Sequence, residues 1–64
     1  MTTLFVYREE DNQVVARISG DDDEALLERA AFEYGSGDFC YTFTPAFGMS
    51  DGLIPGDDVV DIEV

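Results

Sequence analysis

Residues 21–35, DDDEALLERAAFEYG, predict a helix and limit how the rest of the chain can be arranged. Asp is a favoured N-cap residue, and carboxylates in the first turn complement the positive end of the helix dipole. The segment from Ala25 to Tyr34 consists mostly of good helix formers, and Gly35 stands where a glycine commonly ends a helix. Apolar residues recur at spacings of three and four, which predicts one buried side, formed by Leu27, Ala30, Ala31 and Tyr34 and widened by Leu26.

Two strand-like segments before this helix predict a β-hairpin. Residues 3–8 and 13–19 are rich in β-branched and aromatic side chains, and the polar residues 9–12 separate them. Pairing the two segments around a four-residue turn places Phe5 opposite Ala16 and Tyr7 opposite Val14. The predicted helix-facing side is Phe5, Tyr7, Val14, Ala16 and Ile18, and the predicted back face is Leu4, Val6, Arg8, Gln13, Val15 and Arg17. That back face is more apolar than a solvated sheet, so we expect a loop, a second copy or a partner to cover it.

Two further strand patterns follow the helix. Residues 38–44 alternate strictly, and residues 57–64 carry apolar side chains at positions 60, 62 and 64. The side chains expected to face inward are Phe39, Tyr41, Phe43, Val60, Ile62 and Val64. Residues 45–56 contain two Pro and three Gly and predict a loop. The order ββαββ predicts a single α+β domain over residues 1–64, with a mainly antiparallel four-stranded sheet and one helix packed on one face.

The chain is strongly acidic, with fifteen Asp and Glu against three Arg, no Lys and a formal net charge of −12. The acids are concentrated after residue 20, where twelve of them accompany one arginine. Eight aromatic residues and 45% apolar content favour a folded domain over a disordered acidic tail. Such a charge disfavours direct binding to nucleic acid or to an anionic membrane. Because crowded like charges reduce folding stability, their density indicates a function.

Two rows of carboxylates form the candidate partner-binding site. Helical spacing places Asp21, Glu24 and Glu28 along one flank of the helix. Alternation places Asp61 and Glu63 about 6.6 Å apart on the last strand, close to the step of about 6–7 Å between phosphates along a DNA strand. The full candidate set is Asp21, Asp22, Asp23, Glu24, Glu28, Asp57, Asp58, Asp61 and Glu63.

This pattern predicts an inhibitor that mimics DNA and occupies a basic nucleic-acid-binding surface of another protein. Two alternatives fit the same composition. The acidity could be a halophilic or solubility trait of a small structural protein that forms a homodimer through Leu4, Val6 and Val15. The chain could also be an antitoxin-like neutraliser of a basic toxin. The sequence leaves both a monomer and a homodimer open.

Residue types needed for common catalytic sites are missing or isolated. There is no His, and Cys40 therefore lacks a base, while its acidic neighbours should keep the thiol protonated. Paired carboxylates could in principle hydrolyse glycosides, but a 64-residue domain is too small to frame a sugar cleft. The consecutive acids of residues 21–24 lack the alternating ligand spacing of an EF-hand and are more typical of a helix cap. We expect no enzymatic activity, no metal site and no cofactor.

The expected location is the cytoplasm of the host or infected cell. A single Cys cannot form an internal disulfide, the N-terminal residues lack the basic region of a signal peptide, and no apolar run approaches about 20 residues.

A small, Lys-free, strongly acidic α+β chain resembles the anti-CRISPR proteins of phages and mobile elements, particularly inhibitors of type I surveillance complexes. The resemblance covers the whole chain and rests on size, architecture and charge. The residues that carry it are Asp21-Asp22-Asp23-Glu24, Glu28, Glu33, Asp38, Asp57-Asp58, Asp61 and Glu63. It implies that the chain covers Lys and Arg in a DNA-binding channel, as several acidic members do, whereas other members bind elsewhere or through apolar contacts. The chain differs from the purest DNA mimics by retaining Arg8 and Arg17, which the predicted register places on one face.

Overall fold

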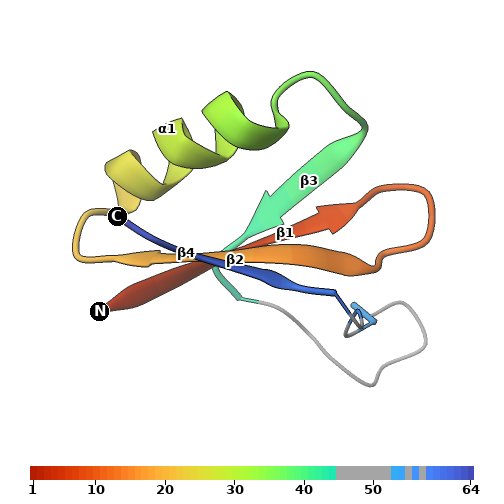
Figure 1. Cartoon of the computed structure of the whole chain (residues 1–64), viewed down its shortest axis with the longest axis horizontal. Coiled ribbons are helices and arrows are strands. Elements are labelled where there is room, and N and C mark those ends of the chain that lie inside the picture. The colour runs from red at the N-terminus through yellow and green to blue at the C-terminus, as the bar shows by residue number, and fades with distance from the viewer. Residues whose placement is uncertain (45–52, 55, 57) are drawn as a thin grey trace.

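The computed structural model describes residues 1–44, 53, 54, 56 and 58–64. The elements are β1 (Thr2–Arg8), β2 (Val14–Gly20), α1 (Asp23–Tyr34), β3 (Phe39–Thr42) and β4 (Val60–Glu63). The strands form one sheet in the order β3-β1-β2-β4, and α1 packs against one face of it (Figure 1). The predicted α+β class and ββαββ order are confirmed. Most of the predicted loop 45–56 lies outside the described residues.

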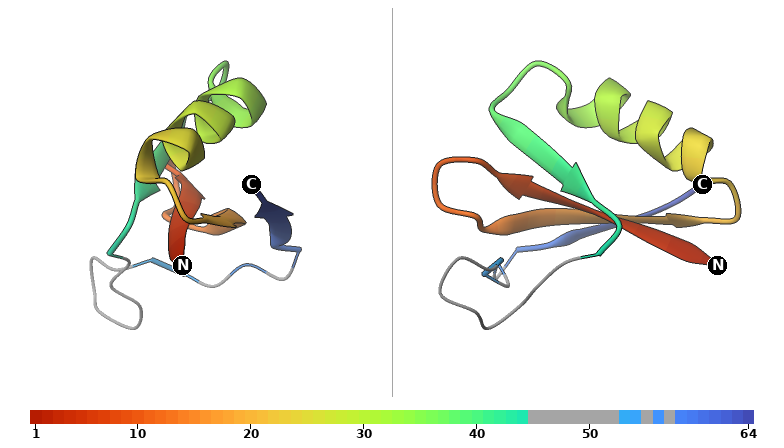
Figure 2. Two further views of the ribbon diagram at one scale, coloured as in Figure 1. Left: turned by 90° about the vertical axis from the view of Figure 1, so that its left-hand side faces the viewer. Right: turned by 180° about the vertical axis from the view of Figure 1, so that it is seen from behind.

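The sheet is mixed, with β4 at one edge. β1 pairs antiparallel with both β2 and β3, whereas β4 runs parallel to β2. Figure 2 shows α1 on one side of the sheet and β4 at its margin, and α1 makes its contacts with β1, β2 and β3. Val60 and Ile62 share the helix-facing side with Ala16 and Ile18, as predicted. Val60 nevertheless remains 50% exposed, and Val64 55%, because the helix does not extend over β4.

The hairpin register contains a shift that the sequence did not predict. β1 and β2 pair Leu4 with Ile18 and Val6 with Ala16, and the register then shifts so that Tyr7 lies opposite Val14. The shift leaves Val15 as an extra residue in β2, which is the arrangement of a β-bulge. Because neighbouring side chains point to opposite faces, the extra residue places Leu4 and Val6, and not Phe5 and Tyr7, on the face of Ala16 and Ile18.

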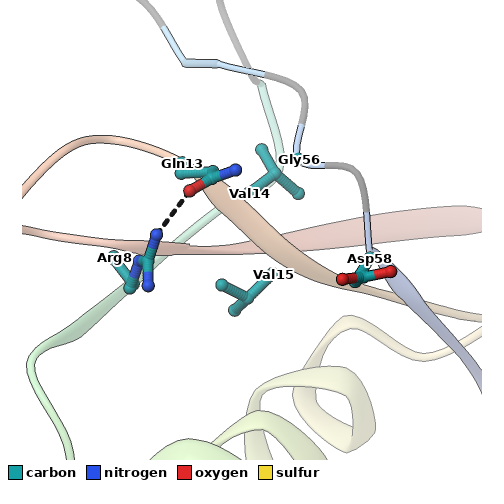
Figure 3. A pocket seen from close by; sticks show the side chains of 6 residues that line it. All are labelled: Arg8, Gln13, Val14, Val15, Gly56 and Asp58. Carbon is teal, nitrogen blue, oxygen red and sulfur yellow. Dashed lines mark hydrogen bonds between the residues drawn. The ribbon is translucent and has the colours of Figure 1, made fainter.

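The predicted faces of the first strand are therefore wrong. Leu4 and Val6 point toward α1 and are 1% and 0% exposed, whereas Phe5 and Tyr7 lie on the other face. Val14 and Val15 are exchanged as well, and Figure 3 shows their side chains on opposite sides of β2, with Val15 on the side of α1. The alternative of a homodimer through Leu4, Val6 and Val15 has no exposed face of these residues to use, because they pack in or against the core.

The core lies between the central strands and the helix. Its fully buried members are Leu4, Val6, Ala16, Ile18, Leu26 and Ala30. The expected inner face of residues 38–44 is confirmed, because Phe39, Tyr41 and Phe43 pack against this cluster. Phe39 meets the Tyr34 ring edge-on with centroids 5.2 Å apart, and the Tyr41 hydroxyl donates to the Ala30 carbonyl at 3.5 Å. These contacts attach the end of α1 to β3.

The buried side of α1 is rotated from the predicted one. Leu26 and Ala30 are 0% exposed, whereas Leu27 is 43% exposed and Ala31 is also exposed. Gly20 provides a physical reason for this rotation. A Cβ added at Gly20 would lie 3.1 Å from Leu26 Cδ2, so the missing side chain lets Leu26 pack directly against the end of β2.

The predicted helix cap is present at Asp22. Its carboxylate accepts a hydrogen bond from the Glu24 backbone N–H at 3.1 Å, and its carbonyl accepts one from the Leu26 N–H at 3.1 Å. The side chain therefore satisfies one of the backbone donors that the first helical turn leaves free.

Asp22→Ala should lower the free energy of unfolding by about 1 kcal/mol through loss of the cap. Asp22→Asn removes the same charge but keeps a good capping group, so its stability should stay close to that of the wild type. Urea unfolding followed by circular dichroism measures both variants. Equal losses in the two variants would attribute the effect to charge and not to capping.

Candidate functional site

The three arginines are all engaged with acids of the same chain. Arg8 Nη2 lies 2.8 Å from Asp11 Oδ2, Arg17 Nε lies 2.8 Å from Asp61 Oδ1, and Arg29 Nε lies 3.3 Å from Glu33 Oε1. The described acids without an arginine partner are Glu9, Glu10, Asp21, Asp22, Asp23, Glu24, Glu28, Asp38, Asp58 and Glu63. Asp21 lies 3.9 Å from the N-terminal ammonium of Met1, and no described ion pair offsets the charge of the other nine.

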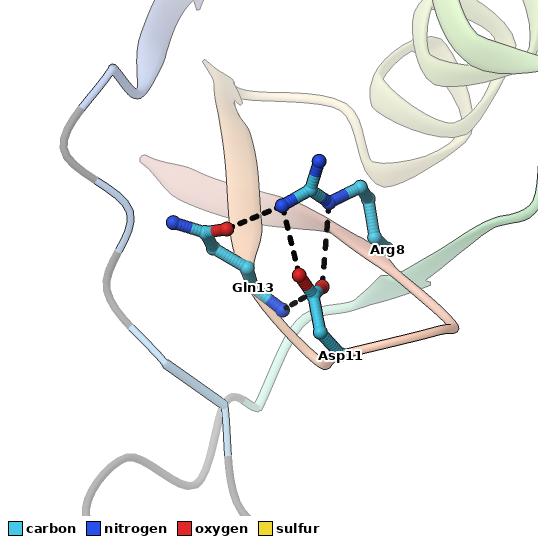
Figure 4. A network of polar contacts seen from close by, with 3 residues as sticks. All are labelled: Arg8, Asp11 and Gln13. Carbon is cyan, nitrogen blue, oxygen red and sulfur yellow. Dashed lines mark hydrogen bonds and ion pairs between the residues drawn. The ribbon is translucent and has the colours of Figure 1, made fainter.

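The Arg8 group stabilises the hairpin turn (Figure 4). Arg8 donates to both carboxylate oxygens of Asp11, at 2.8 and 3.3 Å, and to the side-chain carbonyl of Gln13. The Gln13 backbone N–H donates to Asp11 Oδ1 at 3.1 Å, and Asn12 adopts a left-handed φ of 57° that reverses the chain. The Gln13 N–H, and to a smaller extent Arg8, holds the pKa of Asp11 below its usual value. Asp11 is thus an internal turn residue.

Arg8 and Arg17 do not share a face, contrary to the predicted register. Arg8 lies opposite Phe39, on the helix-facing side of β1, whereas Arg17 lies opposite Phe5 on the other side. Since each is bound to an acid, neither adds uncompensated positive charge to the surface.

The predicted carboxylate row on α1 is present and exposed. Asp21 precedes the helix with a side chain that is 95% exposed, and Glu24 and Glu28 follow on the solvent side of α1. Residues three and four apart on a helix have Cβ atoms about 5–6 Å apart, which applies to Glu24 and Glu28, whereas Asp21 precedes the extended N-cap residue Asp22 and lies outside the helix. We call Asp21, Glu24 and Glu28 the acidic row. Asp23 is also exposed in the first helical turn, beside the capping Asp22.

The predicted row on the last strand is only partly available. Asp61 and Glu63 lie on the same face of β4, opposite Arg17 and Ser19. The ion pair with Arg17 offsets the charge of Asp61, whereas Glu63 has no arginine partner. Glu63 lies near the start of α1, because the next residue, Val64, donates its N–H to the Ser19 carbonyl at 2.8 Å.

The other two candidates are not brought into this group. Asp58 is exposed beside the hairpin turn, at the end of the sheet opposite the start of α1 (Figures 1 and 3). Asp57 lies outside the described residues. The structure therefore gathers Asp21, Asp22, Asp23, Glu24, Glu28 and Glu63 toward one end of the molecule and leaves Asp58 at the other.

A hollow of about 240 Å³ lies beside the hairpin turn (Figure 3). It is lined by Arg8, Gln13, Val14, Val15, Gly56 and Asp58. A Cβ added at Gly56 would lie 2.4 Å from the Val14 carbonyl oxygen, so only glycine permits this close approach. The nearby Ile54 is hydrogen-bonded to β2, with the Val14 N–H donating to its carbonyl at 2.9 Å. Because Arg8 is bound to Asp11 and Gln13, we assign the hollow to the packing of this segment against the hairpin.

The remaining chemistry-bearing groups are dispersed. Tyr7 and Cys40 lie opposite each other on the face away from α1, and burial together with Cys40 raises the pKa of Tyr7 above its usual value. Among the described residues, Asp, Glu and Cys side chains form no group of three that could hold a metal ion. The described part of the chain also contains no helix with the length and apolar character needed to cross a membrane.

One exposed residue was given no role by the sequence patterns. Phe32 lies on α1 outside the predicted buried stripe and is 82% exposed. The available signal was its spacing of four from Glu28, which places it in the same series as the acidic row.

Comparison with family models, characterised proteins and solved structures gives no match to this chain.

Proposed function

We propose that this protein binds a basic, nucleic-acid-binding surface of another protein and occupies it in place of nucleic acid. The observation that carries the proposal is the acidic row of Asp21, Glu24 and Glu28. These carboxylates are exposed and have no arginine partner, while each of the three arginines is bound to another acid. Glu24 and Glu28 have no cation partner among the described residues, and Asp21 has only the exposed N-terminal ammonium at 3.9 Å, so this charge is available to cations of a partner.

A rigid helix suits the acidic row to this task. The cap at Asp22 and the buried side chains of Leu26 and Ala30 fix α1 on the sheet, so the spacing of Glu24 and Glu28 is set before binding. That spacing, about 5–6 Å between Cβ atoms, is similar to the step of about 6–7 Å between phosphates on one DNA strand. A preorganised series of charges loses little conformational freedom when it binds.

Electrostatic attraction would dominate the encounter. Lys and Arg form charge-assisted hydrogen bonds with carboxylates as they do with phosphates. Complementary fields accelerate association and make it sensitive to salt. Direct binding of the protein to its basic target should therefore be tightest at low ionic strength.

The specific target that we propose is a type I CRISPR surveillance complex. The support for it is the resemblance in size, α+β architecture and charge to small anti-CRISPR proteins, some of which cover basic residues of a DNA-binding channel. The proposed site of action is the cytoplasm of the host or infected cell, where such complexes meet their target DNA.

The direct test is a gel-shift assay of target DNA with a purified type I surveillance complex. Adding the folded protein should release the DNA, and excess DNA should restore the shifted band. Poly-glutamate at equal charge concentration is the control and should compete less, because its charges are not fixed in space. Undiminished DNA binding at saturating protein would contradict the proposal for that complex.

A further inference from the structure

Helix α1 is apolar on two sides. Its inner side consists of the buried Leu26 and Ala30 with the half-buried Tyr34. A second set of apolar side chains, Leu27, Ala31 and Phe32, lies on exposed positions, and we call this set the outer apolar strip. Phe32 is 82% exposed and Leu27 is 43% exposed. The sheet packs against the inner side only, so the strip is not explained by the fold of the described residues.

The outer apolar strip and the acidic row form one surface. Glu28 precedes Phe32 by four residues and Ala31 by three, and these spacings make helix residues neighbours. Glu24 extends the series by a further turn toward the cap. An aromatic side chain thus lies at one end of a line of carboxylates on the same helix.

We propose that Phe32 inserts into an apolar pocket of the partner protein while Glu24 and Glu28 bind Lys or Arg residues at the rim of that pocket. This inference rests on the proposed function and specifies the surface that the target must present. Exposed aromatic residues are frequent anchors of protein interfaces, since they bury a large area and lose little conformational freedom. A rim of cations complementary to the carboxylates would orient the helix and exclude water from the pocket.

Charge selects this occupant over a second copy of the chain. Two copies joined through α1 would bring two acidic rows together. The one arginine of the helix, Arg29, is already bound to Glu33. Like charges placed this close repel, so self-association at this surface is disfavoured. The same repulsion disfavours an anionic membrane as the occupant.

The test compares Phe32→Ala with the wild type in the DNA-release assay with the surveillance complex. Phe32→Ala should raise the protein concentration for half-release by about tenfold or more, because the anchor is lost. That ratio should persist at about 300 mM NaCl, since apolar burial is not screened, whereas the ratio for Glu28→Gln should shrink. Ile54→Ala is the matched control and should have no effect, because Ile54 is 53% exposed but lies beside β2, away from α1.

The melting temperature and the release of DNA together distinguish a loss of folding from a loss of binding. Phe32→Ala should melt at the wild-type temperature, because a side chain that is 82% exposed contributes little to the core. Phe32→Leu retains an apolar side chain and should restore most of the inhibition. If the wild type releases DNA and Phe32→Ala is equally potent, this inference is overturned and the proposed function stands. Failure of the wild type itself to release DNA would overturn both.

Discussion

Leu26→Ala should unfold much of this protein, whereas the same substitution at the adjacent Leu27 should leave it folded. Leu26 is 0% exposed and packs beside Gly20, while Leu27 is 43% exposed. Truncation of a fully buried leucine typically costs about 2–5 kcal/mol, and a domain of this size rarely has more than about 3–5 kcal/mol of stability. Leu27→Ala should cost less than about 1 kcal/mol, since its side chain is already partly in solvent.

Urea unfolding of both variants, followed by far-UV circular dichroism, measures this difference. The pair is closely matched, because both substitutions remove the same atoms from neighbouring positions of one helix. Similar losses of stability at Leu26 and Leu27 would contradict the orientation of α1 on the sheet. A larger loss at Leu27 would support the buried stripe that the sequence pattern predicted.

The order of the elements could be predicted because its signals are local. The acidic cap and Gly35 bracket the helix, and the alternation of residues 39–43 identifies a strand without reference to any distant residue. The faces of the hairpin could not be predicted in the same way. Leu4 and Val6 are apolar, and so are Phe5 and Tyr7, so alternation alone does not distinguish the buried side. Which side of β1 is buried depends on the extra residue Val15 in β2, for which the sequence carries no clear signal.

The rotation of α1 illustrates the same difficulty. Seven of the twelve helix residues are apolar, and the sequence alone leaves open which of them are buried. Contact with Gly20 selects Leu26, and this contact depends on how the helix crosses the end of β2. The apolar pattern therefore predicted the helix and the inward position of Leu26, Ala30 and Tyr34 correctly, but wrongly included Leu27 and Ala31.

The candidate-site residues also differ in whether the local sequence determines their surroundings. Glu24 and Glu28 were predicted correctly as exposed helix neighbours because their positions depend only on the period of one helix, whereas the exposed Asp21 lies before its first turn. The state of Asp61 was not predicted, because its partner Arg17 is 44 residues away in the sequence and adjacent only through the parallel pairing of β2 and β4. The net charge predicts neither the exposure of the acidic row nor the ion pair between Arg17 and Asp61, because it counts acids and does not identify their partners.

Replacing the acidic row by neutral residues should abolish most of the inhibition while the fold is retained. The triple variant Asp21→Asn, Glu24→Gln, Glu28→Gln removes three exposed carboxylates and leaves the cap at Asp22 in place. If each contributes a charge-assisted contact worth about 1 kcal/mol, the concentration for half-release of DNA should rise by about a hundredfold. The dependence of inhibition on salt should also weaken, because fewer ion pairs form.

A second triple variant determines whether position or total charge matters. Glu9→Gln, Glu10→Gln, Asp38→Asn removes the same number of exposed acids from the hairpin-turn end, where the Glu9 N–H donates to the Asp38 carbonyl at 2.9 Å. This end is separated from Asp21 by the length of β1, about 20 Å for seven residues, so a partner docked on α1 should tolerate the change. Because the two variants have equal net charge, long-range attraction is weakened equally in both, and only contact at α1 distinguishes them. Equal loss of inhibition in the two triples would mean that net charge acts without a defined surface, and the acidic row would then have no special role.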